Sequence, residues 1–172
     1  MTPEQERLIL SLVTMPGQTG RGSATPQELL RAFGATDGPT LCRDLLAAAV
    51  AERSAVDVEL TLIMSFTLGL DRSALPALRE LAREPWHGSH EDIAVLLEEV
   101  GGAEVVDDLE FLAWAGPEFQ NYDGSTSLAK KAAHGLERVA TPEARAAISR
   151  LRHHHEQEIR DLVERMERRQ AP

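Results

Sequence analysis

Two histidines and a glutamate near the middle of the chain are the residues whose types could hold a metal ion. His87 and His90 are three residues apart and Glu91 follows directly, so their side chains would share one face of a helix. A Gly-Ser pair separates the histidines, however, and Ser89 stands where a helix N-cap is expected, with Asp92 three residues later. We therefore interpret the segment as a capped helix start and predict no metal site. Metal ligation is the alternative.

The remaining residues with reactive side chains do not form a recognisable catalytic set. Three consecutive histidines, 153–155, would point about 100° apart on a helix and cannot chelate one ion, so we interpret them as a solvated stretch or a break in the last helix. Cys42 is the single cysteine and is predicted to be a small buried thiol. The sequence contains no Gly-x-Ser-x-Gly, phosphate loop or His-Glu-x-x-His motif. We predict a protein that is not an enzyme and that needs no cofactor.

Acidic residues are concentrated in one central block. The formal net charge is −10, and residues 84–129 contain eleven Asp and Glu but no Lys or Arg. Apolar stripes in 89–100 and 103–115 would be buried, which would leave the carboxylates on one exposed face. We predict that this face attracts a basic protein partner; a merely solvated face is the alternative. The predicted partner-binding residues are Trp86, His87, Glu91, Asp92, Glu98, Glu99, Asp107, Asp108, Glu110, Tyr122 and Asp123.

The elements that must position these residues are all predicted to be helices. Apolar residues recur at helical spacing through most of the chain, and no segment alternates long enough to indicate a strand. The 55–69 segment is apolar nearly all round, which places it at the centre of the fold. From residue 40 onward the predicted helices are 40–52, 55–69, 72–83, 89–100, 103–115, 126–139 and 142–169, the last with a possible break at the histidines.

Two helix starts near the N-terminus have strong local signals. Thr2 and Thr25 each precede a proline, and Gln5 and Glu28 stand three residues after them, as in a capping box. Gly34 is in a position to end the second of these helices. Both helices are therefore predicted with defined first turns.

The chain is also similar to itself at a spacing of 39 residues. Aligning residues 93–105 with 132–144 places Leu97 on Leu136 and Glu98 on Glu137. Each copy is an apolar helix, a short turn and a second apolar helix. A helix pair of this kind cannot bury its apolar stripe alone and has to stack on neighbouring pairs.

This pattern resembles HEAT repeats, in which a turn such as Ala140-Thr141-Pro142-Glu143-Ala144 joins two helices. The resemblance covers residues 40–152, with 1–35 and 153–172 as N- and C-terminal caps. It implies a single domain over 1–172 with an all-α fold, a right-handed α-α superhelix of HEAT-like helical hairpins.

A more specific likeness lies in Glu84–Ile93, which contains a Trp-His…His-Glu-Asp turn, and in the later Tyr-Asp pair of Phe119–Asp123. Both are similar to segments of small bacterial HEAT proteins, some of which resemble immunity proteins that neutralise secreted toxins. The likeness implies a non-catalytic protein-binding module. The chain differs from this group at His134-Gly135, where a bulky aromatic residue followed by Ala is usual. Because Gly135 costs about 1 kcal/mol of helix propensity, we expect a locally weaker repeat there.

Two other classes of function stay open. A HEAT-like enzyme of the DNA-glycosylase or chromophore-lyase type is one, and a passive adaptor or assembly scaffold is the other. A DNA-binding version would need a basic stripe, whereas the middle of this chain is acidic, so we predict no nucleic-acid partner. No apolar run approaches the about 20 residues that span a bilayer, and the N-terminus has no signal-peptide pattern. We therefore expect no membrane association and a cytoplasmic protein.

Overall fold

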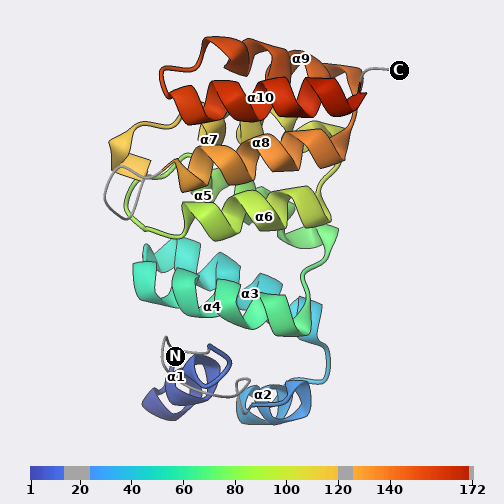
Figure 1. Ribbon diagram of the computed structural model, residues 1–172. Coiled ribbons are helices and arrows are strands. Elements are labelled where there is room, and N and C mark those ends of the chain that lie inside the picture. The colour runs from blue at the N-terminus through green and yellow to red at the C-terminus, as the bar shows by residue number, and fades with distance from the viewer. Residues whose placement is uncertain (14–23, 120–125, 171–172) are drawn as a thin grey trace. The chain divides into compact units, whose positions relative to one another are not determined.

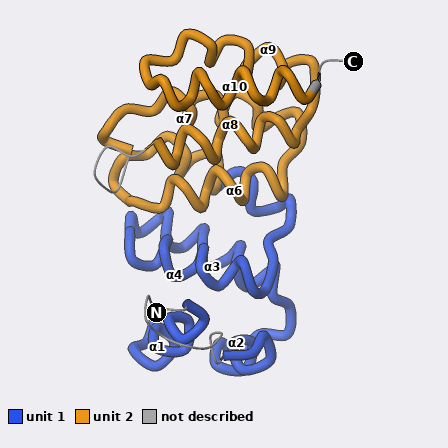
Figure 2. Tube along the Cα trace, viewed as in Figure 1, with its two compact units in different colours: residues 1–77 blue, residues 78–172 orange. Residues whose placement is uncertain are grey.

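The computed structural model describes residues 1–13, 24–119 and 126–170, and every regular element in these ranges is a helix (Figure 1). The prediction of an all-α protein is confirmed. The chain divides into two compact units, residues 1–77 and 78–172 (Figure 2). No helix among the described residues combines the length and the apolar character needed to cross a membrane. The prediction of one domain across the whole chain stays a prediction.

Unit 1 begins with two short helices whose starts follow the capping signals in the sequence. Thr2 Oγ1 accepts a hydrogen bond from the Gln5 amide, and the Gln5 side chain accepts one from the Thr2 amide at 2.9 Å. Thr25 and Glu28 form the same reciprocal pair. Gly34 ends the second helix at φ 63°, a left-handed conformation that glycine adopts without strain. The helices of this unit are α1 (Pro3–Leu10), α2 (Pro26–Phe33), α3 (Gly38–Glu52) and α4 (Ala55–Leu68), followed by the short 3-10 helix η1 (Arg72–Ala74).

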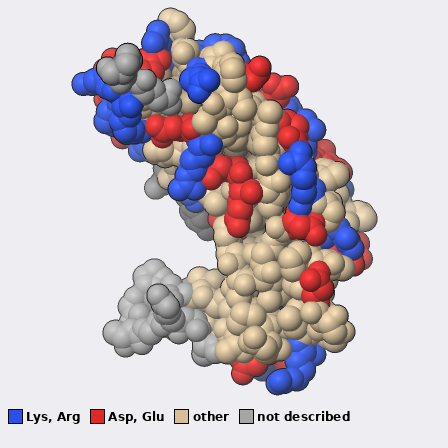
Figure 3. Space-filling model, turned by 90° about the vertical axis from the view of Figure 1, so that its right-hand side faces the viewer, with Lys and Arg blue, Asp and Glu red and all other residues tan. Residues whose placement is uncertain are grey.

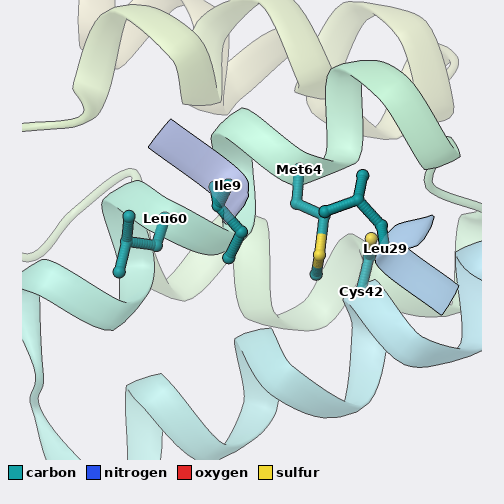
Figure 4. Packing of buried hydrophobic residues seen from close by; sticks show 5 residues of the cluster. All are labelled: Ile9, Leu29, Cys42, Leu60 and Met64. Carbon is teal, nitrogen blue, oxygen red and sulfur yellow. The ribbon is translucent and has the colours of Figure 1, made fainter. Parts of the chain in front are cut away.

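The core of unit 1 is aliphatic and includes the cysteine. One buried cluster brings together residues from all four helices (Figure 4): Ile9, Leu29, Cys42, Leu60 and Met64. Burial raises the pKa of the Cys42 thiol, which keeps it protonated and unreactive. The predicted small buried thiol is confirmed.

Helix α4, which is predicted to lie at the centre of the fold, leaves two of its apolar side chains exposed. Val58 and Leu62 are fully buried, but Val56 is 58% exposed and Phe66 is 49% exposed. Apolar residues on every side of a helix therefore do not imply that every side of the helix is buried.

Unit 2 is a stack of helical pairs in two layers. Helix α8 packs against α6, α7, α9 and α10, and α7 also packs against α9. Figure 1 shows α6, α8 and α10 side by side in one layer, with α7 and α9 in the other. The α-helices are α5 (Leu75–Leu81), which begins in unit 1, α6 (His90–Val100), α7 (Val106–Trp114), α8 (Ser127–Val139), α9 (Pro142–Arg150) and α10 (Gln157–Gln170). Short 3-10 turns are η2 (Ala103–Val105), η3 (Pro117–Phe119) and η4 (Leu151–His153).

The internal repeat corresponds to equivalent positions in this stack. Leu97 of α6 and Leu136 of α8 are both fully buried, as the self-alignment requires. Leu109 of α7 and Ile148 of α9, another aligned pair, are buried as well. The predicted break in the last helix is confirmed, because α9 ends at Arg150 and α10 begins at Gln157.

Gly135 of α8 has a packing role that helix propensity alone did not reveal. A Cβ atom at this position would lie 3.1 and 3.2 Å from the two δ-carbons of Leu109 and 3.5 Å from the Glu98 Cβ. The missing side chain thus allows α8 to approach both α7 and α6 closely. The expected weak point is a site of tight helix packing.

Candidate functional site

The predicted acidic face of α6 and α7 is joined to basic side chains from helices that flank it in the sequence. Glu98 of α6 forms an ion pair with Arg138 of α8 at 2.8 Å. Glu91 of α6 pairs with Lys131 of α8, also at 2.8 Å. On α7, both carboxylate oxygens of Glu110 accept hydrogen bonds from Arg150 of α9. Three carboxylates of a block with no Lys or Arg in its own sequence are therefore paired with bases from other helices.

The position of Asp108 differs most clearly from the predicted exposed face. Its side chain is only 1% exposed, although it was predicted to lie on the exposed face. Arg79 Nε donates to Asp108 Oδ2 at 2.6 Å, and Arg83 donates to Oδ1 through Nε at 3.1 Å and Nη2 at 2.9 Å. These arginines belong to α5 and to the turn after it. Asp108 therefore holds two helical pairs together and is not accessible to a partner.

The ion pairs follow the repeat. Glu98 and Glu137 are equivalent residues of α6 and α8, and each pairs at 2.8 Å with an arginine of the next helix in that layer, Arg138 or Arg169. We call these two pairs the rungs of the layer. On the part of the surface that unit 2 forms in Figure 3, acidic and basic side chains accordingly lie next to one another. Some carboxylates of α6 and α7 therefore share their surface with bases from other helices.

Within the predicted set, the residues that reach solvent fully lie near one turn. Glu99 ends the exposed side of α6, and Asp107 is in the first turn of α7; both are exposed. Asp92 is half-buried, and burial raises the pKa of its carboxyl group. Tyr122 and Asp123 lie outside the described residues.

His87 has a structural role in place of the predicted contact with a partner. Its ring is 5% exposed, and Nε2 lies 2.9 Å from the Leu81 carbonyl oxygen. Nδ1 accepts a hydrogen bond from the Ser89 amide at 3.2 Å. Since a carbonyl can only accept, Nε2 carries the proton and the ring is neutral. Ser89 is at the N-cap position but its side chain makes no capping hydrogen bond, so that part of the prediction was wrong.

His154 repeats this arrangement two helical pairs later. Its Nε2 lies 3.0 Å from the Ala113 carbonyl oxygen, and its Nδ1 accepts from the Glu156 amide at 3.1 Å. We call His87 and His154, with these two bonds each, the histidine clips. Each clip stacks on a second histidine with ring centroids 4.2 Å apart and lies against a tryptophan; the neighbours are His90 with Trp86 and His155 with Trp114.

The clips terminate helices. Leu81 is the last residue of α5 and Ala113 lies in the last turn of α7, so each ring binds a carbonyl at a helix end. The Leu81 carbonyl also accepts the Glu84 amide at 3.1 Å. Burial lowers the pKa of both His87 and His154, as expected for rings that must stay neutral. The sequence reading missed His154 because three adjacent histidines looked solvated. The sequence carried one signal for the clips. Each clip histidine lies in a turn between helices, two residues before the residue whose backbone amide it binds.

His90 completes the first clip. It is 1% exposed, its Nε2 bonds to the Glu84 carbonyl oxygen at 3.0 Å, and its Nδ1 has no hydrogen-bond partner among the described residues. Burial, together with the neighbouring His87, lowers the pKa of His90 to about 4.

Within residues 1–13, 24–119 and 126–170, no group of three His, Cys, Asp or Glu side chains is arranged to hold a metal ion. Trp86, half-buried, lies with its ring 5.0 Å from that of His87.

In comparisons with known proteins, no family model, curated protein or solved structure matches the chain.

Proposed function

We propose that this chain is a non-catalytic protein-binding module of the HEAT type, and that it binds a basic protein partner at the turn between α6 and α7. The observation that carries the proposal is the position of Glu99 and Asp107, which are exposed on either side of this turn. Unit 2 has nineteen acidic and twelve basic residues, so a formal charge of −7 is left after every base is counted.

The electrostatics of the helix ends favour this turn over the rest of the face. Glu99 lies in the last turn of α6, where the helix macrodipole is already negative and no basic residue is present to compensate it. The carboxylates farther from the turn, Glu91, Glu98 and Glu110, are screened by their ion pairs. The positive N-terminal end of α7 and the nearby charge of Arg150 offset part of the Asp107 charge, so Glu99 contributes most of the negative potential at the turn. Such a patch would speed encounter with a basic surface and select against acidic ones.

An immunity protein that covers a basic toxin domain is the specific form of this proposal that we favour. Helical pairs stacked to a common core present a rigid surface, and a rigid surface loses little conformational entropy on binding. The superhelical arrangement and the protein's role as an inhibitor, as opposed to an adaptor or assembly scaffold, are parts of the same proposal.

The test is a charge reversal at the turn. The variant Glu99→Lys/Asp107→Lys is used with the wild type as bait for cross-linking and mass-spectrometric identification of partners from the native cell. The isolated partner is then titrated by calorimetry at 0.05 and 0.15 M salt. We expect a basic partner, at least tenfold weaker binding by the variant, and weaker wild-type binding at the higher salt.

The matched control is Glu52→Lys/Glu143→Lys. Glu52 ends α3 and Glu143 is in the first turn of α9, so this variant makes the same change of charge at equivalent helix positions elsewhere on the chain. It should bind like the wild type. An equal loss of affinity in both variants would show that net charge, and not the turn, determines binding. Unchanged affinity in the turn variant would refute the proposed contact.

A further inference from the structure

Two arginines of unit 2 share a single carboxylate. Arg79 and Arg83 are one helical turn apart and both donate to Asp108, which is 1% exposed, while their own side chains are 45% and 47% exposed. By contrast, Arg150 with Glu110 and Arg138 with Glu98 are one-to-one ion pairs. The two guanidinium groups of Arg79 and Arg83 therefore carry more positive charge than the one carboxylate that they share can balance.

The pair also has hydrogen-bond donors to spare. A guanidinium carries five N–H groups, so two carry about ten. Three N–H groups contact the Asp108 carboxylate: Arg79 Nε, Arg83 Nε and Arg83 Nη2. Arg83 Nη2 additionally lies 3.5 Å from the Asp107 carbonyl oxygen. Half-exposed side chains with unused donors can bind a further acceptor without giving up Asp108.

Both guanidinium groups are held in place before any ligand arrives. Nε of each is fixed by a buried carboxylate, and the Arg83 guanidinium carbon lies 4.8 Å from the centroid of the Phe111 ring. A cation over an aromatic face is attracted to it, and its motion is restricted. Preorganised arginines lose less side-chain entropy on binding than free ones, and their planar forks match carboxylate and phosphate oxygens.

We propose that Arg79 and Arg83 form a binding site for an oxyanion, the carboxylate or phosphate group of a ligand. This site goes beyond the proposed function, because it selects an acidic group whereas the α6–α7 turn selects a basic surface. Asp108 orients the two guanidinium groups from behind and is a positioning residue. The ligand oxygens contact the N–H groups that Asp108 leaves unused.

The experiment follows the Nε–Hε resonances of the arginines by NMR in the full chain, at low ionic strength and pH 6.5. The probes are inorganic phosphate, acetate, a peptide with a free C-terminal carboxylate, and the same peptide amidated and carrying one phosphoserine. We expect saturable shifts of Arg79 and Arg83 with a dissociation constant of about 1 mM or below for at least one oxyanion. The peptides then identify the source of the group. Arg138 and Arg150 should shift little.

Two variants separate the site from nonspecific attraction. Arg79→Gln removes one guanidinium but leaves the bonds from Arg83 to Asp108, and it should weaken binding at least tenfold. Arg150→Gln removes the same charge from a one-to-one pair and should leave binding unchanged. Should Arg79→Gln fail to fold, the wild-type comparison of Arg79 and Arg83 with Arg138 and Arg150 decides. Shifts that are linear in every probe, or equal at all four arginines, would overturn the proposal, whatever the outcome for the α6–α7 turn.

Discussion

Glu98 of α6 lies 2.8 Å from Arg138 of α8, and the equivalent Glu137 lies at the same distance from Arg169 of α10. An ion pair that recurs at equivalent positions belongs to the way the helical pairs stack. Exposed pairs of this type contribute little individually and are screened by salt. Both pairs join neighbouring helices of one layer, so the carboxylates of Glu98 and Glu137 are occupied within the unit.

Asp108 should be the most sensitive charged residue of unit 2. Asp108→Asn leaves two arginines facing each other without a counter-charge, so we expect a loss of about 1–3 kcal/mol in the free energy of unfolding, less than for a fully buried pair because both arginines reach solvent. Urea denaturation followed by circular dichroism measures it. The neighbouring Asp107→Asn should change stability by less than about 0.5 kcal/mol. Equal effects at 107 and 108 would contradict the assigned burial.

Acid should destabilise the protein through His90. The unfolded chain protonates this ring near pH 6.5, whereas the folded protein keeps it neutral down to a pKa of about 4. The unfolded state thus binds the extra proton between these values. Stability is fully present above pH 6.5 and is lost as the pH falls toward 4, by about 3 kcal/mol at most for this residue.

Denaturation midpoints measured from pH 7.5 to 4 test this dependence. His90→Phe keeps an aromatic ring in the stack and removes the titration, so its stability should fall less steeply between pH 6.5 and 4. His153→Gln, at an exposed position, should follow the wild-type curve. A His90→Phe curve parallel to the wild type would show that His90 does not carry the pH dependence.

The second histidine clip should be structural and its stacked neighbour dispensable. His154→Phe removes both bonds of the ring and leaves the Ala113 carbonyl and the Glu156 amide without it. Because buried polar groups that lose a partner are costly, we expect a loss of about 2 kcal/mol. His155→Phe, one residue further on and exposed, should have almost no effect in the same thermal melts. If both variants melt like the wild type, the clip contributes nothing to stability.

Gly135 should resist a substitution that normally strengthens a helix. Gly135→Ala gains about 1 kcal/mol of helix propensity but forces a methyl group to 3.1 Å from Leu109. Overpacking of this kind costs about 1–3 kcal/mol, so the net change should be neutral to destabilising. Combining it with Leu109→Val should relieve the clash, and a double-mutant cycle in urea would then show favourable coupling. Simple additivity, or a stabilising Gly135→Ala, would argue against close packing at this site.

Local signals in the sequence predicted the helices well. Capping boxes at Thr2 and Thr25, the left-handed Gly34 and the break before Gln157 depend on neighbouring residues, so sequence reasoning could find them. The surface could not be predicted in this way. Glu98 and Arg138 are forty residues apart, and which base faces which acid depends on the register of stacked helices.

The same limit explains the errors on α7 and at the histidines. Asp108 was placed outside because it flanks an apolar stripe, yet the arginines that draw it inward come from α5 and the turn after it. His154 binds the carbonyl of Ala113, forty-one residues away in the sequence. Partners that are distant in the sequence leave no periodic pattern in it. Charged residues and histidines were therefore predicted to face solvent.

Helix α8 takes part in both rungs. Its Arg138 pairs with Glu98 of α6, and the adjacent Glu137 pairs with Arg169 of α10. A tandem duplication of the α7–α8 segment would consequently bring its own matching charges, the new arginine meeting the old glutamate. Helix α10 differs, because Arg168 stands beside Arg169 where α8 has Glu137, and its guanidinium turns to Glu164 of the same helix. A copy of α8 placed next to α10 would therefore meet an arginine at the position where α8 offers a glutamate.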